Sequence, residues 1–365
     1  MKVLTIFGTR PEIIRLSIIV KLLDAKCEHV TVHTGQNFHE NLSKVFFDEL
    51  NIRAPDHELD IKGRSFGEQV GQLFSRIENI FDTVNPDRVL ILGDTNSALS
   101  AIIAARRRIP VFHMEAGNRC YDDRVPEEVN RRIIDHSSSI LLPYTERSKE
   151  NLVREGIERE RIFVTGNPIF EVLEYYRENI DTNTILSELS LQPKSYFLAT
   201  IHRAENVDNG EKLRSIFQAF ENISTEFKMP MLVSVHPRTA EKLSKYGITI
   251  DQEKIRLIDA MPFFAFVNLE NNAFMVLTDS GTVQEECAIF GVANVTVRDV
   301  TERPETIECG SNIIGGCTVD SIISSARIAA SNSGSWNAPD EYLQANVSQT
   351  VCNIVLGHLS RREHH

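Results

Sequence analysis

The sequence predicts an α/β protein made of two Rossmann-like, doubly wound domains that face each other across a cleft. Short apolar runs alternate with amphipathic helical stretches along most of the 365 residues. The runs are continuously apolar, which is typical of parallel strands buried on both faces. The rhythm loosens between about residues 179 and 194 and then restarts, so the chain divides into two units of ordinary domain size.

The first half contains a regular β-then-α pattern. Pro11 suits the first turn of a helix, and Gly156 suits a helix end. The predicted strands are residues 3–7, 29–33, 88–92, 111–114, 139–143 and 162–164. The predicted helices are residues 11–23, 66–82, 97–107, 126–136 and 145–156.

The second half repeats the pattern without an obvious sequence repeat. Its predicted strands are residues 196–200, 231–235, 256–258, 275–278 and 294–297, and its predicted helices are residues 211–227, 263–269, 283–289 and 319–330. A last helix, at about 341–359, is expected to return to the first domain. The domains are therefore predicted as 1–180, 195–340 and a C-terminal helical segment 341–362.

Composition excludes several classes of function. A net charge of −12 argues against a nucleic-acid partner, whose binding depends on neutralising phosphates. A small anion stays possible, because a pocket needs only local arginines and helix N-termini. The six cysteines form no CxxC pair, so no metal site is expected. No signal peptide and no apolar run of roughly 18 residues is found, which predicts a cytoplasmic protein without a membrane partner.

Polar motifs follow several predicted strands, and ligands of open parallel sheets bind at those strand ends. Gly8–Glu12 is predicted to present backbone N–H groups to an anion, with Arg10 and Arg15 adding charge. An ordinary βα turn with a surface arginine is an equal alternative. The motif is neither a Walker A loop nor a GxGxxG loop, so a dinucleotide is disfavoured.

Three carboxylates are candidates for proton transfer. Asp94 and Glu115 follow neighbouring strands, and two carboxylates in a partly dry cleft can acquire separated pKa values. For Asp94 alone, a helix N-cap is the more common explanation. Glu127 lies four residues before Arg131 on one helix face, where a surface ion pair is the plain alternative.

The second half offers a matching set of strand ends. His202 and Arg203 end its first strand, and His236 ends the next. Ser280 and Gly281 open a helix with small residues, which favours an anion, and an acid in that helix is expected to reach a ribose. A polar loop follows at residues 298–305.

Taken together, these motifs resemble the non-hydrolysing UDP-N-acetylglucosamine 2-epimerase family. The resemblance runs from Gly8 to about Gly316 and rests on GTRPE, GDTN, EAGNR, PEExNR, HRxEN, HPR, DSGxxQEE and RDxTERPE. It implies a GT-B-like fold, of the UDP-glycosyltransferase and glycogen phosphorylase type. It also implies an isomerase that eliminates UDP to a 2-acetamidoglycal and adds it back on the other face of carbon 2. No cofactor is implied; the implied partners are a UDP-sugar, UDP and a second copy in a homodimer.

The resemblance also implies roles for individual residues. Asp94, Glu115 and Glu127 would be the acid and base carboxylates, with His202 beside the departing charge. The implied UDP and substrate ligands are Arg10, Arg15, Arg131, His236, Ser280, Gly281, Glu286 and Arg303.

Four positions depart from the family pattern. Arg15 stands where many relatives have Lys, Ala204 where many have Arg, and Thr282 where a second Gly is usual. The stretch 35–40 differs from relatives regulated by a second substrate molecule, which argues against that regulation here.

Alternatives remain for the substrate and the reaction. Asn118 and Tyr121 resemble the branch that forms UDP-N-acetyl-L-fucosamine from its talo epimer. A UDP-sugar-dependent glycosyltransferase fits the same architecture, since fold does not fix function. A hydrolysing relative and a catalytically inactive sugar-nucleotide sensor are further alternatives, and the retention of all three carboxylates argues against the sensor.

Overall fold

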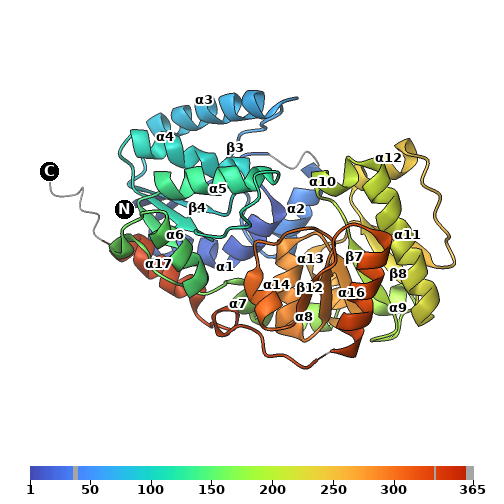
Figure 1. Cartoon of the computed structure of the whole chain (residues 1–365). Helices are drawn as coiled ribbons and strands as arrows, with labels where there is room; N and C mark the ends of the chain where they lie inside the picture. The colour runs from blue at the N-terminus through green and yellow to red at the C-terminus, as the bar shows by residue number, and fades with distance from the viewer. Residues whose placement is uncertain (36–39, 333, 359–365) are drawn as a thin grey trace. The chain divides into compact units, whose positions relative to one another are not determined.

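The chain forms two compact units (Figure 1). The computed structural model describes residues 1–35, 40–332 and 334–358. Unit 1 comprises Met1–Tyr175 and the segment from Glu341 onward, and unit 2 comprises Tyr176–Asp340. The stretch 36–39, within the departure noted at 35–40, lies outside the described residues. None of the described helices has both the length and the apolar character needed to span a bilayer.

Unit 1 is built on a six-stranded parallel sheet with the order β3-β2-β1-β4-β5-β6. This is the Rossmann order, in which the direction of strand addition reverses between β1 and β4. The strands are β1 (Lys2–Phe7), β2 (Glu28–His33), β3 (His57–Glu58), β4 (Arg88–Leu92), β5 (Val111–Met114) and β6 (Ile140–Leu142). The helices are α1 (Arg10–Lys26), α2 (Glu40–Glu49), α3 (Phe66–Val84), α4 (Ser100–Arg106), α5 (Pro126–Ser137), α6 (Glu146–Arg154), α7 (Ile169–Tyr175) and α17 (Val347–Gly357).

The C-terminal helix belongs to unit 1. α17 packs against α1, where Cys352 Sγ lies 3.9 Å from Ile19 O and Lys26 Nζ donates to Gln349 Oε1 at 2.8 Å. The buried guanidinium of Arg88, at the start of β4, donates to Val355 O. These contacts fix the returning segment to the first sheet.

Unit 2 repeats the same order in its own strands, β12-β11-β10-β7-β8-β9, with its reversal between β7 and β10. The strands are β7 (Phe197–Thr200), β8 (Met231–Val235), β9 (Ile255–Asp259), β10 (Met275–Thr278), β11 (Ala293–Thr296) and β12 (Asn312–Ile314). The helices are α8 (Arg177–Asp181), α9 (Ile185–Glu188), α10 (Ala204–Val207), α11 (Gly210–Phe227), α12 (Pro237–Lys245), α13 (Phe263–Asn272), α14 (Gly281–Phe290), α15 (Pro304–Glu308) and α16 (Val319–Ser331). The predicted fold class, two doubly wound parallel-sheet units, is confirmed.

Two of the differences from the sequence-based expectation lie near the boundary between the units. Residues 162–164 form no strand. The segment makes only an isolated bridge, between Ile162 and Leu141. The division between the units falls at Tyr175, ahead of the looser stretch 179–194. α8 and α9 belong to unit 2 because both pack against α13.

Candidate active site

A buried glutamate joins the ends of β1 and β4, at the reversal point of the first sheet. Glu12 Oε2 accepts hydrogen bonds from Gly8 N at 2.6 Å and Thr9 N at 2.8 Å, and Glu12 Oε1 accepts one from Thr95 Oγ1 at 2.6 Å. Burial raises the pKa of Glu12 to about 7, although these hydrogen bonds oppose the shift. The expectation that this turn offers free N–H groups to an anion is therefore wrong for Gly8 and Thr9, because Glu12 already occupies both.

Asp94 follows β4 and is held by an arginine from α5. Arg131 Nη2 lies 2.6 Å from Asp94 Oδ2, and Arg131 Nε donates to the same oxygen at 3.1 Å. Arg131 Nη1 also donates to the buried carboxylate of Glu128 at 2.5 Å. Glu128 in turn accepts from Cys120 N and Tyr121 N, so the turn before α5 and the Asp94 carboxylate are fixed together.

Glu115 follows β5, the next strand in the sheet, and its surroundings differ from those of Asp94. It is buried, and its backbone is left-handed with φ of 65°. Arg15 Nη1 lies 3.1 Å from Glu115 Oε2, Asn118 Nδ2 donates to Oε1 at 3.3 Å, and Tyr144 Oη donates to Oε2 at 3.3 Å. Glu115 also lies beside Gly93, where a Cβ would be 4.0 Å from its Oε2. The structure thus brings Glu115 next to the residue that precedes Asp94.

A second buried network, centred on Asp135, contacts the residues around the end of β5. Asp135 accepts from Gly117 N at 3.2 Å and pairs with Arg119 Nη2 at 2.8 Å and with His113 Nδ1 at 2.9 Å. Burial opposes ionisation, but the neighbouring His113 side chain and Arg119 guanidinium hold the pKa of Asp135 below its usual value. His113 Nε2 lies 2.9 Å from Gly93 O. Asp135 therefore holds the Gly117 backbone after Glu115 and lies against the His113 side chain before it.

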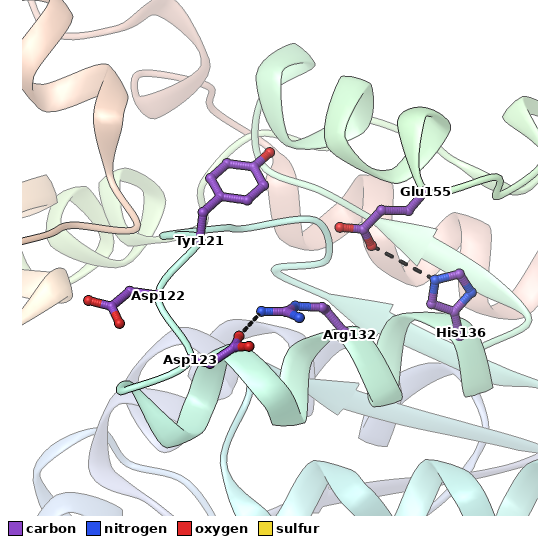
Figure 2. Close-up of a pocket in the computed structure, with 6 residues that line it drawn as sticks. All are labelled: Tyr121, Asp122, Asp123, Arg132, His136 and Glu155. Atoms are coloured by element: carbon purple, nitrogen blue, oxygen red, sulfur yellow. Dashed lines mark hydrogen bonds and ion pairs between the residues drawn. The ribbon is translucent and has the colours of Figure 1, made fainter.

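A hollow of about 540 Å³ adjoins this network at Glu155, which binds Arg119. Figure 2 shows the side chains around the hollow. It is lined by Tyr121, Asp122, Asp123, Arg132, His136 and Glu155. Arg132 pairs with Asp123, and His136 Nε2 lies 3.8 Å from Glu155 Oε2 (Figure 2). Glu155 also binds Arg119 through two hydrogen bonds. The charges around the hollow are largely paired with each other, and none of its residues is among the predicted site residues.

Two further predicted residues of unit 1 lie near helix starts. Arg10 opens α1 and is half-buried, with its guanidinium 5.3 Å from the centre of the Phe46 ring. Burial lowers the pKa of Arg10. Glu127 is half-buried in the first turn of α5, immediately before the fully buried Glu128.

Unit 2 has a buried carboxylate at its own reversal point, between the ends of β7 and β10. Asp279 accepts from His202 N at 3.1 Å, from Arg203 N at 2.9 Å and from Asn206 Nδ2 at 3.1 Å. Its Oδ1 also lies 3.2 Å from His202 Nδ1, while the His202 side chain remains 47% exposed. Asp279 therefore fixes the His202 ring from its buried edge.

The start of α14 carries the predicted anion loop. Ser280 is the N-cap residue, and a Cβ on Gly281 would lie 3.0 Å from Glu302 Oε1 and 3.6 Å from Arg303 Cζ. Arg303 is buried and donates to Glu285. Two other arginines bind Glu302: Arg203 at 3.1 Å and Arg298 at 2.8 Å. Arginines from the segments after β7 and β11 thus lie near this helix N-terminus, where they are paired with the carboxylates of Glu302 and Glu285.

The remaining predicted residues of unit 2 are His236 and Glu286. His236 is the N-cap of α12, and its Nδ1 accepts from Arg238 N at 3.3 Å. Glu286 is buried within α14, and burial together with the charge of Glu286 raises the pKa of Glu270 on α13.

Several residues that organise the site have no predicted role: Glu12, Glu128, Asp135, Asp279 and Glu302. A sequence signal exists for Glu12, since Thr9-x-x-Glu12 matches the capping-box pattern, and the structure has that box. The Pro126–Arg131 stretch holds two adjacent glutamates, and only burial distinguishes Glu128 from Glu127.

Comparison with known proteins finds relatives along nearly the whole chain. The family model described as UDP-N-acetylglucosamine 2-epimerase matches residues 21–356. The UDP-N-acetylglucosamine 2-epimerase of Methanocaldococcus jannaschii is 40% identical over 348 residues, which cover 93% of this chain and 95% of that protein. The UDP-2,3-diacetamido-2,3-dideoxy-D-glucuronate 2-epimerase of Pseudomonas aeruginosa is 36% identical over 332 residues, covering 90% and 92%.

Solved structures agree with both the fold and the family. The crystal structure of the M. jannaschii UDP-GlcNAc 2-epimerase in complex with UDP-GlcNAc and UDP matches with a TM-score of 0.93 and 38% identity, covering 98% of this chain and 99% of that one. The glycosyltransferase WaaG, at 11% identity and a TM-score of 0.61, shows only that the fold is GT-B-like. On the extent of the family match and the identity to its members, this chain belongs to the UDP-N-acetylglucosamine 2-epimerase family.

Proposed function

We propose that this protein inverts carbon 2 of a UDP-linked 2-acetamido sugar, with UDP-N-acetylglucosamine as the first substrate to test. The observation that carries the proposal is the placement of Asp94 and Glu115 at the ends of adjacent strands in different settings. Asp94 is partly exposed and paired with Arg131, whereas Glu115 is buried among Arg15, Asn118 and Tyr144. Two carboxylates with unlike surroundings suit a reaction that removes a proton and returns one.

The proposed reaction proceeds by anti elimination of UDP to a 2-acetamidoglycal, followed by re-addition. A base takes the proton from carbon 2 while the bond from carbon 1 to the UDP oxygen breaks, and the electron pair leaves with UDP. In the second step UDP returns to carbon 1 and an acid gives a proton to the opposite face of carbon 2. Asp94, Glu115 and Glu127 are the proposed acid and base groups.

UDP itself is proposed to bind through cationic and helix-terminal groups. Arg10, His202, His236, Ser280, Gly281 and Arg303 would contact the diphosphate, and Glu286 the ribose. Asp279 accepts a hydrogen bond from His202 N and lies 3.2 Å from the ring Nδ1, which supports a His202 ring held ready to stabilise the charge on departing UDP. Because Arg15 pairs with Glu115 and Arg131 with Asp94, we propose that these two arginines also position the carboxylates, besides any contact with substrate.

The sugar specificity is a narrower proposal. Asn118 resembles the fucosamine-forming branch, and its contact with Glu115 supports an influence on the reacting carboxylate. Tyr121 is 69% exposed and donates through its hydroxyl to Asn151. Turnover of a panel of UDP-2-acetamido sugars separates the two substrates: preference for a 6-deoxy talo or fuco sugar supports the branch, and turnover of UDP-N-acetylglucosamine alone contradicts it.

A homodimer is also proposed. Val129 and Ile133, one turn apart on α5, expose 43% and 40% of their surface, which supports burial against a second copy. Light scattering at micromolar concentration measures the mass, and a monomer at all concentrations would contradict the proposal.

The reaction is tested by NMR of UDP-N-acetylglucosamine incubated with the protein in deuterated water. Epimerisation with deuterium at carbon 2 is expected, because the proton is lost and replaced from solvent. Asp94→Asn, Glu115→Gln and Glu127→Gln should each lower turnover by about 10²–10⁴, the usual contribution of a general acid or base, and leave UDP affinity nearly unchanged. Product without deuterium, or near-normal turnover in all three variants, would refute the elimination mechanism.

A further inference from the structure

Glu128, in the first turn of α5, is a fully buried carboxylate to which the proposed function assigns no role. Its Oε2 accepts from Cys120 N at 3.0 Å and from Arg131 Nη1 at 2.5 Å, and its Oε1 accepts from Tyr121 N at 3.1 Å. Arg132 lies at the edge of this group, with its Nη2 3.7 Å from Glu128 Oε1. Glu128 and Arg131 have the i to i+3 spacing of ordinary surface pairs on helices. Their side chains are 0% and 3% exposed, however, so this pair is part of the interior.

Arg131 links the buried carboxylate of Glu128 to that of Asp94. Its Nη2 and Nε both donate to Asp94 Oδ2, at 2.6 and 3.1 Å, while its Nη1 donates to Glu128. A guanidinium is planar and rigid, so holding one of its edges also fixes the other. Exposure of the side chain rises along the series, from 0% at Glu128 through 3% at Arg131 to 23% at Asp94. Glu128 therefore fixes, from the interior, the group that holds the partly exposed Asp94 carboxylate.

The backbone of Asp94 is held by a different side chain of the same helix. Asn130 Nδ2 donates to Asp94 O at 3.1 Å and to Asn96 Oδ1 at 3.2 Å. The turn after β4 thus has a support from α5 that does not pass through Glu128. A change at Glu128 should therefore act on the orientation of the Asp94 side chain and leave this turn in place.

The surroundings of Glu128 favour its ionised form. Burial raises the pKa of Glu128, but the hydrogen bond from Cys120 N and the charge of Arg131 outweigh burial and hold this pKa below its usual value. A buried arginine also needs partners for its own charge, because an unpaired charge in the interior is costly. Asp94 and Glu128 pair with different nitrogen atoms of Arg131, so the guanidinium is held on both sides.

We propose that Glu128 is a positioning residue, which holds the Arg131 guanidinium so that Arg131 orients the Asp94 carboxylate for proton transfer. The inference rests on the proposed function, because that function assigns proton transfer to Asp94. Both hydrogen bonds from Arg131 reach Asp94 Oδ2, so they also set the direction of the other oxygen, Oδ1. Proton transfer needs a narrow range of distance and angle, so an Asp94 side chain that is free to rotate reacts more slowly.

Glu128→Gln tests the role by its effect on turnover. Gln has one acceptor oxygen in place of two, so it cannot serve Arg131 and both backbone N–H groups as Glu128 does. The kcat for UDP-N-acetylglucosamine should fall by roughly 10- to 100-fold, because a misplacement of about 1 Å can cost about 100-fold. UDP affinity, measured by calorimetry, should stay near the native value. A native kcat, or a loss confined to KM or to UDP affinity, would overturn the role.

A cycle of variants with Asp94 separates positioning from general damage to the fold. In Asp94→Asn the group that Glu128 orients has lost its chemistry, so adding Glu128→Gln should change the remaining turnover by less than about twofold. Product accumulated over hours and measured by NMR gives the rates of these slow variants. An equal loss from Glu128→Gln in both backgrounds would overturn the proposal, because Glu128 would then act only through the turn at Cys120 and Tyr121.

Two further variants complete the test. Glu171→Gln is the matched control: Glu171, on α7, also accepts a backbone N–H, from Ser348 at the start of α17 at 2.8 Å, and its kcat should be native. If urea unfolding shows that Glu128→Gln does not fold, Arg131→Lys decides. A single ammonium cannot hold both carboxylates as a guanidinium does, so kcat should fall similarly, and a native kcat would overturn the role. No epimerisation by the native protein would overturn the proposed function together with the role of Glu128, whereas an active native protein with unaffected variants would overturn the role alone.

Discussion

Glu12 shows how a single buried residue couples protonation to stability. Its pKa is raised from the ordinary 4.5 to about 7, so the native state holds a proton that the unfolded chain has already lost. The stability that the neutral group contributes is complete below about pH 4.5. It is lost as the pH rises through 7, by roughly 3 kcal/mol at most.

Glu12→Gln tests this coupling. Gln keeps an acceptor for Gly8 N and Thr9 N and offers its amide to Thr95, so the variant should fold. Urea unfolding between pH 4.5 and 8 should show the native protein losing stability relative to the variant as the pH rises. Glu68→Gln, at an exposed position of α3, is the control. Parallel pH profiles for native protein and Glu12→Gln would contradict the prediction.

At the scale of elements, Gly117 decides how closely α6 packs against the end of β5. It is left-handed, with φ of 81°, and an added Cβ would overlap the Ser148 carbonyl oxygen and lie 2.8 Å from Leu152 Cγ. Gly117→Ala should therefore cost roughly 3 kcal/mol or more. Gly156→Ala is the matched control: its φ is 86° but nothing lies within 4 Å, so only about 1–2 kcal/mol is expected. Equal losses in urea unfolding would show that packing against α6 is not the cause.

Elements were predictable from sequence where periodicity and caps agree, as for α5 with Pro126 at its start. The stretch 162–164 is apolar enough for a strand, but strand formation depends on partners. Here it makes one isolated bridge, between Ile162 and Leu141, and one backbone hydrogen bond from Phe163 N to Leu141 O. The carboxylates Asp94 and Glu115 were predictable because they follow strands. Their arginine partners were not, since Arg15 and Glu115 are 100 residues apart and their pairing depends on tertiary packing.

At the scale of the molecule, the two units share the same arrangement at the point where their strand order reverses. Each has a Rossmann strand order, and in each a buried carboxylate fixes the turn at the point where the order reverses: Glu12 in unit 1 and Asp279 in unit 2. Reversal points are where open α/β sheets bind ligands. The side chains that follow these two turns differ, however. Unit 1 holds the carboxylates proposed for proton transfer, and unit 2 holds most of the proposed UDP ligands.

This division predicts how variants in the two units combine. Arg10 of unit 1 and His202 of unit 2 are both proposed to act on the diphosphate of one UDP molecule. Arg10→Ala should weaken UDP binding by about 1.5–3 kcal/mol, as expected for a hydrogen bond to a charged group, and His202→Ala should also weaken it. Because groups that share one ligand are coupled, the double variant should depart from the sum of the single losses by about 0.5 kcal/mol or more.

Calorimetry on the two single variants and the double variant measures this coupling. Arg10→Ala combined with Glu226→Gln provides the reference, since Glu226 is exposed and paired with Arg327, and its effects should simply add. Additivity within about 0.3 kcal/mol for Arg10 and His202 would mean that they act independently. In that case the diphosphate is held by the groups of one unit, and the other residue must be assigned to a different part of the substrate.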